Sequence, residues 1–98
     1  MLLVQDQLSI LELKRLLHAI KDLSPETGVR FRFMGEMWHP DFTRVASITE
    51  EGVTVYDERN NRYMLIQNFT YIMQFELDTP FQQYRPHFHY TIDTSVPD

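Results

Sequence analysis

Two histidines near the carboxyl end of the chain have a spacing that suits metal binding. His87 and His89 are separated by one residue, so both imidazoles would project from the same face of an extended strand. The nearest further ligands are His39 and Asp41, in a loop earlier in the sequence. A zinc-type site needs three or four converging groups, and local geometry links only His87 and His89. The alternative interpretation makes these two histidines the polar side of an edge strand.

Arginine and tyrosine residues in the middle of the chain suggest a second chemistry, the binding of RNA or single-stranded nucleic acid. Arginine makes bidentate contacts to phosphate, and tyrosine stacks on bases. The candidate face consists of Arg30, Arg32, Arg44, Tyr56, Arg59, Arg62 and Tyr63. Acidic residues are interleaved with these arginines, so cross-strand ion pairing explains them equally. The net charge of −5 also works against nonspecific attraction to phosphate.

The segment from Trp38 to Phe42 is the most chemically mixed loop in the sequence. It combines the only tryptophan of the chain with His39, Pro40 and Asp41. Tryptophan is a favoured anchor of interfaces, and binding residues often lie on loops held by a rigid scaffold. An exposed loop would be a binding tip, whereas a buried Trp38 would cap one end of the core.

Catalytic chemistry has little basis in this sequence. The chain has no cysteine, which excludes disulfides and thiolate catalysis. No G-x-S-x-G motif activates a serine, and the three glycines are too dispersed for a phosphate loop. The acid pairs 50–51 and 57–58 fall in expected turns, where carboxylates are commonly solvated. We therefore expect a protein that is not an enzyme and needs no cofactor.

The first part of the chain predicts an amphipathic helix over residues 9–23. Ser9 and Glu12 form the S-x-x-E capping box, and Leu8 and Leu13 stand at the positions of a hydrophobic staple. Apolar residues then recur with helical spacing. The charges in this N-terminal segment argue against a signal peptide or a membrane span, so the sequence predicts a cytoplasmic protein without membrane contact.

Short alternating segments separated by turns follow this helix and predict antiparallel strands. The expected strands cover residues 29–33, 43–49, 53–56, 63–66, 71–77 and 88–92. In the fifth of these, the alternation places Tyr71, Met73, Phe75 and Leu77 on the buried face. Pro80 and Pro86 precede the last strand and indicate that it lies at a sheet edge. The whole chain, 1–98, forms one domain with a helix and turn (1–28), a barrel or sheet (29–77) and a C-terminal arm (78–98).

This order of elements predicts an α+β, mostly β fold, in which an N-terminal helix precedes a small barrel or curved sheet of five to six antiparallel strands. It resembles SH3-like and Sm-like barrels in architecture only. The second Sm motif, a basic residue followed by glycine, would fall near Gln67-Asn68-Phe69 and is absent there. No RNA-binding residue is therefore carried over from that family.

Together, the amphipathic helix, the many aromatic residues and the apolar strand beyond the prolines present more apolar surface than one core of this size is expected to bury. The leading hypothesis is thus a non-enzymatic interaction module, homo-oligomeric or adaptor-type, whose partner is a protein and first of all a second copy of itself. Its expected interaction residues are Trp38, His39, Phe42, Phe88, Tyr90 and Ile92. A nucleic-acid binder and a small metalloprotein using His39, His87 and His89 are the two alternatives.

Overall fold

A capped helix lies near the start of the described residues. The computed structural model describes residues 7–78 and 88–95, and only the backbone of residues 88 and 89. Helix α1 spans Ile10–Leu23 with Ser9 as its N-cap. The Ser9 hydroxyl accepts a hydrogen bond from the Glu12 N–H at 3.1 Å, and the Glu12 carboxylate accepts one from the Ser9 N–H at 2.9 Å. The predicted capping box is confirmed.

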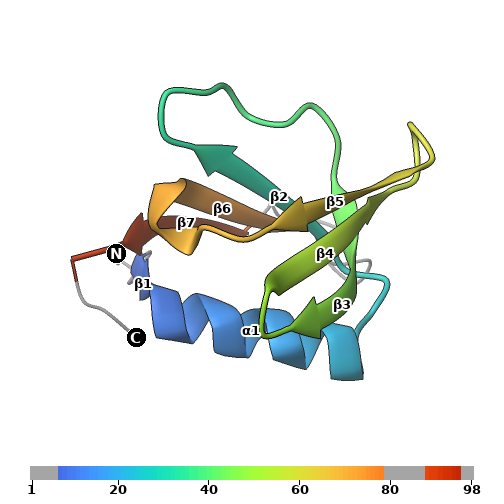
Figure 1. The fold of residues 1–98 in the computed structure, drawn as a ribbon, viewed down its shortest axis with the longest axis horizontal. Coiled ribbons are helices and arrows are strands. Elements are labelled where there is room, and N and C mark those ends of the chain that lie inside the picture. Colours follow the sequence, from blue (N-terminus) through green and yellow to red (C-terminus); the bar gives the residue numbers. More distant parts are fainter. Residues whose placement is uncertain (1–6, 79–87, 96–98) are drawn as a thin grey trace.

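The sheet has seven strands in the order β1-β7-β6-β2-β3-β4-β5. Their bounds are β1 Gln7–Ser9, β2 Gly28–Phe33, β3 Thr43–Thr49, β4 Gly52–Asp57, β5 Arg62–Ile66, β6 Ile72–Asp78 and β7 Phe88–Asp93, with a 3₁₀ turn η1 at Phe69–Tyr71. All neighbours are antiparallel except β1 and β7. The sheet curves over α1 without closing (Figure 1). The mostly β fold with an N-terminal helix is confirmed, as a curved sheet.

The predicted last strand exists, but its placement at the sheet edge was wrong. Strand β7 pairs with β6 on one side and with β1 on the other. Strand β1 has only three residues, immediately before the helix cap, where the sequence indicated no strand. Pairing of Leu8 with Ile92 covers the edge that β7 would otherwise present. The free edges of the described sheet therefore belong to β1 and β5.

A bulge in β6 changes which residues face the core. Arg32 pairs with Gln74 and Phe33 pairs with Ile72, so Met73 is an extra residue on its strand. One extra residue reverses the side-chain alternation on either side of it. Ile72 is consequently buried and Tyr71 is exposed, the reverse of what simple alternation predicted for these two positions. Phe75 and Leu77 are buried as expected.

The core lies between the helix and the concave side of the sheet. Leu13 and Leu17 of α1 are fully buried there. The rings of Phe31 and Phe75 approach within 5.1 Å between centroids. The remaining buried apolar residues are Ile10, Ile20, Val29, Val45, Val53, Val55, Ile66, Phe69, Ile72, Leu77 and Ile92. None of the helices in the described ranges has the length and apolar character that crossing a bilayer requires.

Candidate functional site

A pocket forms where β2 separates from β3. The two strands pair only at Gly28–Arg44 and Val29–Thr43, whereas β2 pairs with β6 along its whole length. Beyond Val29, no described strand pairs with β2 on its β3 side, although the His39 N–H donates to the Phe31 carbonyl oxygen at 3.4 Å. The chain instead leaves in a long connection, 34–42, while the β4–β5 hairpin curves over from the opposite side (Figure 1).

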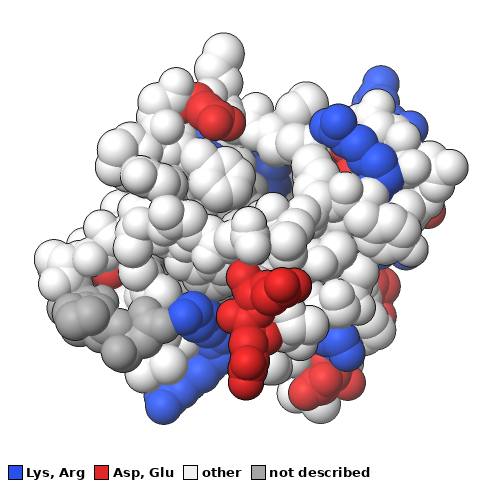
Figure 2. Space-filling view, viewed as in Figure 1, with Lys and Arg blue, Asp and Glu red and all other residues white. Residues whose placement is uncertain are grey.

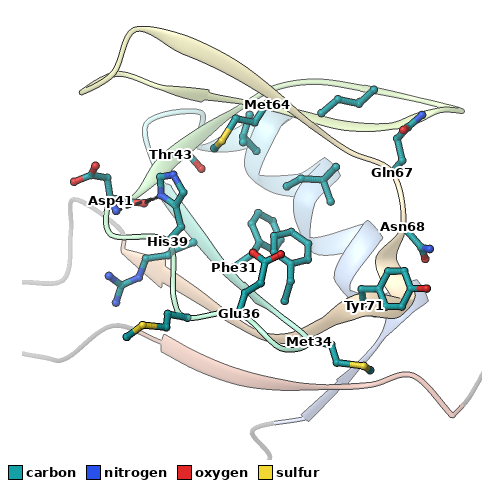
Figure 3. Close-up of a pocket in the computed structure, with 16 residues that line it drawn as sticks. Phe31, Met34, Glu36, His39, Asp41, Thr43, Met64, Gln67, Asn68 and Tyr71 are labelled. Atoms are coloured by element: carbon teal, nitrogen blue, oxygen red, sulfur yellow. Dashed lines mark hydrogen bonds between the residues drawn. The ribbon is translucent and has the colours of Figure 1, made fainter.

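This pocket has a volume of about 590 Å³ and a largely apolar lining. Phe31, Phe33, Val55 and Ile66 are among its lining residues, and Met64 and Leu65 contribute from β5. Polar side chains surround them: Arg30, Glu36, His39, Asp41, Thr43, Gln67 and Asn68. Figure 3 shows Glu36 reaching from the connection toward the aromatic rings, with Met64 on the opposite side. A volume of this order and an apolar lining with a few polar groups are typical of binding pockets.

Exposed apolar side chains are concentrated at this pocket. Among the described residues, seven large apolar side chains are exposed, and four of them line it: Met34, Met37, Leu65 and Tyr71. Met37 is 89% exposed. Isolated apolar residues are normal on a surface, but a contiguous group marks an interaction site. Methionine is also adaptable in shape, which suits a binding surface.

The 34–42 connection is held at both of its ends. The Met34 N–H donates to the Tyr71 carbonyl oxygen at 2.7 Å, and the Glu36 N–H donates to the Phe33 carbonyl oxygen at 3.0 Å. At the far end, the Thr43 hydroxyl donates to the Val29 carbonyl oxygen at 2.9 Å. These bonds tie the pocket wall to β2 and η1, so the pocket is built into the fold.

A buried carboxylate stands beside the pocket, and the sequence interpretation missed it. Asp57 was expected to be solvated in a turn, yet its side chain is fully buried. The Asn60 side-chain amide donates to it at 2.7 Å, and the Asn60 N–H donates at 3.3 Å. His39 Nε2 lies 3.6 Å and Arg62 Nε 3.8 Å from the same Asp57 oxygen. The Asp57-x-x-Asn60 spacing of an Asx-type turn was the signal available in the sequence.

These contacts favour the charged form of Asp57. The side-chain hydrogen bond from Asn60 has the largest effect and lowers the pKa of Asp57. The Asn60 N–H and the charges of His39 and Arg62 lower this pKa further. Burial raises it, but the pKa remains below its ordinary value of 3.8. The charged Asp57 therefore contributes fully to the free energy of unfolding when the pH is above the unfolded-state pKa of this residue. That contribution is lost as the pH falls through the lower folded-state pKa.

We expect Asp57→Asn to destabilise the protein at neutral pH, because the amide cannot replace the charged acceptor. The difference from wild type should shrink as the pH falls below about 4, where the wild-type carboxylate becomes protonated. Urea denaturation at a series of pH values measures this difference. Glu50, which is exposed in the turn between β3 and β4, offers a control in Glu50→Gln. A gap between wild type and Asp57→Asn that stays constant down to acid pH would contradict the assignment.

His39 Nε2 lies 3.6 Å from Asp57, beyond hydrogen-bond distance, so the two side chains make an electrostatic contact and not the hydrogen-bonded pair that orients a general base. The opposite ring nitrogen of His39, Nδ1, contacts the Asp41 carbonyl oxygen at 2.9 Å. Thr43 lines the same pocket, but its hydroxyl donates to the Val29 carbonyl oxygen. Its proton is thus already engaged, and Thr43 is not an activated nucleophile. The contact between His39 and Asp57 joins the 34–42 connection to the β4–β5 hairpin.

The arginines of the predicted nucleic-acid face all have structural partners. Arg30 pairs with Glu76, and Arg32 donates to the Gln74 side-chain oxygen at 2.7 Å. The other pairs are Arg44 with Glu58, Arg59 with Asp41 and Arg62 with Asp57. Figure 2 shows acidic and basic residues interspersed on the face in view. The contacts match the ion-pairing interpretation of these arginines.

The strand register brings only some of that face together. Arg44, Tyr56 and Tyr63 form one row across β3, β4 and β5, with the two tyrosine rings 4.9 Å apart between centroids. Arg62 precedes Tyr63 and therefore projects to the other side of β5, where it meets Asp57. The seven predicted residues do not share one side of the sheet.

The residues predicted for protein interaction are placed mainly in structural roles. Trp38 and Phe42 are half-buried against the Arg30 guanidinium, whose carbon lies 5.2 Å and 4.7 Å from their ring centroids. Ile92 is buried, and the ring of Tyr90 stacks near Phe75 at 6.3 Å. Strand β7 is flanked by β1 and β6, so Tyr90 and Ile92 do not lie on an edge strand as expected.

Most of the predicted metal-binding side chains are not among those that the structure describes. His87 and the side chains of Phe88 and His89 are not among the described residues, and His39 is engaged with Asp57 and Asp41. Within the described ranges, no three histidine, aspartate or glutamate side chains gather as a metal site would require.

Comparison with known proteins yields no relative for this chain. No protein-family model, curated protein or solved structure matches it. The pocket between the 34–42 connection and β5 is therefore assigned from its own geometry as the candidate functional site.

Proposed function

We propose that this protein is a non-enzymatic interaction module that receives an extended apolar segment of a protein in the pocket beside β5. The observation that carries the proposal is the gathering of Met34, Met37, Leu65 and Tyr71 around one cavity. Leaving these side chains in water costs roughly 25 cal/mol for each Å² of apolar area. A partner that covers them recovers that free energy.

The wall that β5 contributes favours an extended segment as the occupant. Strand β5 has a neighbour only on its β4 side in the described sheet. An added strand would hydrogen-bond to its free edge and place alternate side chains toward the cavity, the mode known as β-augmentation. Nucleic-acid binding has no comparable support, because the arginines proposed for it are ion-paired or hydrogen-bonded.

A peptide titration at protein concentrations low enough for a monomer tests this function. The probe is a fluorescent peptide of alternating leucine and lysine. The single tryptophan, Trp38, is a second reporter, because its two neighbours in the sequence both line the pocket. Met34→Ala and Tyr71→Ala should each weaken binding by about fivefold, the effect of roughly 1 kcal/mol of lost apolar contact.

Leu23→Ala is the matched control, since Leu23 is 82% exposed on α1 and does not line the pocket. It should bind the peptide like wild type. If no apolar peptide binds, or if Leu23→Ala weakens binding as much as Tyr71→Ala, the proposed function is refuted.

A further inference from the structure

At two residues, strand β5 presents backbone groups with which no other described strand pairs. A Cβ added to Gly52 would lie only 2.1 Å from the Ile66 carbonyl oxygen, so Ile66 directs its backbone groups toward β4. Because the direction of these groups alternates along a strand, Met64 also faces β4, whereas Tyr63 and Leu65 direct their N–H and C=O groups away. The described part of the chain places no strand on that side.

Apart from Arg62 at its start, the same strand lacks the features that usually protect a sheet edge. Such edges are commonly blocked by proline, lysine, a bulge or an inward-facing charge. Strand β5 pairs with β4 without a register shift, and its only charged residue is Arg62 at its start. Tyr63 is 68% exposed and Leu65 is 49% exposed. This edge is therefore suited to accept another strand.

The sequence of β5 is complementary to itself in an antiparallel arrangement. When two copies pair with Met64 opposite Met64, Tyr63 of each copy lies opposite Leu65 of the other. These are the two residues whose backbone groups point outward, so both can form ladder hydrogen bonds. Each pair joins an aromatic to an aliphatic side chain, a stabilising cross-strand combination.

The charges fit this arrangement as well. Arg62 of one copy lies opposite Ile66 of the other, which keeps the two arginines about 13 Å apart along the strands. Opposing side chains share a face, so each Arg62 comes to the side on which Ile66 lines the pocket. The Glu36 side chain lines that pocket and has no hydrogen bond or ion pair with another described residue. The second copy thus brings Arg62, which also lies 3.8 Å from its own Asp57, to a pocket in which the Glu36 carboxylate has no partner among the described residues.

We propose that two copies of this chain dimerise through antiparallel pairing of their β5 strands, so that each copy covers the apolar pocket of the other. The inference rests on the proposed function, because it identifies the extended segment as β5 of a second copy. The interface is isologous and closes on itself, so it yields a dimer and not a filament.

Light scattering and sedimentation across the micromolar range test the dimer. The wild-type mass should rise to that of two chains as concentration increases. Leu65→Lys should remain a monomer throughout, because it places a lysine opposite Tyr63 in the ladder and removes its apolar contact. Leu23→Lys introduces the same charge at an exposed site on α1 and should dimerise like wild type. Circular dichroism verifies that each variant is folded.

Substitutions of Glu36 test the orientation of the two strands. Glu36→Gln should lower the association constant by about two- to fivefold, the range for partly exposed ion pairs. Glu36→Arg should lower it further, because it places two arginines side by side. A dimer that persists in Leu65→Lys, or a Glu36→Arg dimer as tight as that of wild type, would overturn the proposal.

The outcomes also separate this inference from the function on which it rests. A wild-type chain that stays monomeric but binds the leucine and lysine peptide refutes the dimer and leaves the interaction module intact. A monomeric chain that binds no apolar peptide refutes both.

Discussion

Gly52→Ala is expected to lower the free energy of unfolding by about 3 kcal/mol or more, since both backbone strain and steric overlap arise at that position. Gly52 has φ of +152°, a region that side-chain-bearing residues rarely adopt. The new Cβ would lie 2.1 Å from the Ile66 carbonyl oxygen and 3.0 Å from its carbonyl carbon. These atoms belong to the backbone, so the hairpin itself must move. Urea denaturation with an unchanged m-value measures the loss.

Gly35→Ala is the control that separates overlap from conformational strain. Gly35 also has a positive φ, +77°, but no atom lies within 4 Å of the position its Cβ would take. Alanine should cost only about 1–2 kcal/mol there. Equal losses in the two variants would show that Gly52 does not pack against β5 as described. Because Gly52 positions Ile66, its variant should also weaken dimerisation, whereas Gly35→Ala should retain it.

Phe75→Ala is expected to remove about 3–5 kcal/mol of stability, the usual result of replacing a buried phenylalanine. Phe75 is fully buried on β6, between β2 and β7. Its ring lies 5.1 Å from that of Phe31 and 6.3 Å from that of Tyr90. Truncation to alanine would leave a cavity bordered by the neighbouring strands β2 and β7. The total free energy of unfolding of such a domain is about 5–15 kcal/mol, so the variant should be marginally stable.

Tyr71→Ala is the informative comparison for Phe75→Ala. Simple alternation over residues 71–77 places both rings in the core, whereas the bulge at Met73 leaves Tyr71 53% exposed. Tyr71→Ala should therefore cost about 1 kcal/mol or less, as for other surface substitutions. A loss similar to that of Phe75→Ala would indicate that the bulge is absent and that Tyr71 is packed inside.

Local signals in the sequence predicted the elements of the fold well. The helix start at Ser9 follows from the capping box, whose two hydrogen bonds are both present. The strand boundaries follow from alternation and from turn residues such as Asn61, which has the positive φ of 50° that asparagine tolerates. These features depend on a few neighbouring residues, so a single sequence contains them.

Features that depend on distant partners were not predictable in this way. Strand β1 forms because Leu8 pairs with Ile92, more than eighty positions away, and no local pattern announces that pairing. Asp57 was interpreted as a solvated turn residue because neither His39 nor Arg62 is adjacent to it in sequence. The Met73 bulge shifts the alternation without a glycine or proline to mark it.

The candidate site was predicted only in part for the same reason. The sequence indicated the loop around Trp38 and His39, and His39 does line the pocket. It did not indicate Leu65 or Tyr71, which alternation treats as ordinary strand residues. The exposed methionines Met34 and Met37 on either side of Gly35 and Glu36 were the available signal, since apolar side chains in a turn have no core to enter.

Amide hydrogen exchange along β5 distinguishes a free strand edge from a paired one. The amides of Met64 and Ile66, which face β4, should be protected at every protein concentration. The amides of Tyr63 and Leu65 should exchange quickly in dilute protein and become protected as concentration rises and the second β5 strand pairs with them. Fast exchange of Tyr63 and Leu65 at concentrations where the chain is a dimer, or protection of both in the dilute monomer, would rule out dimerisation through this edge.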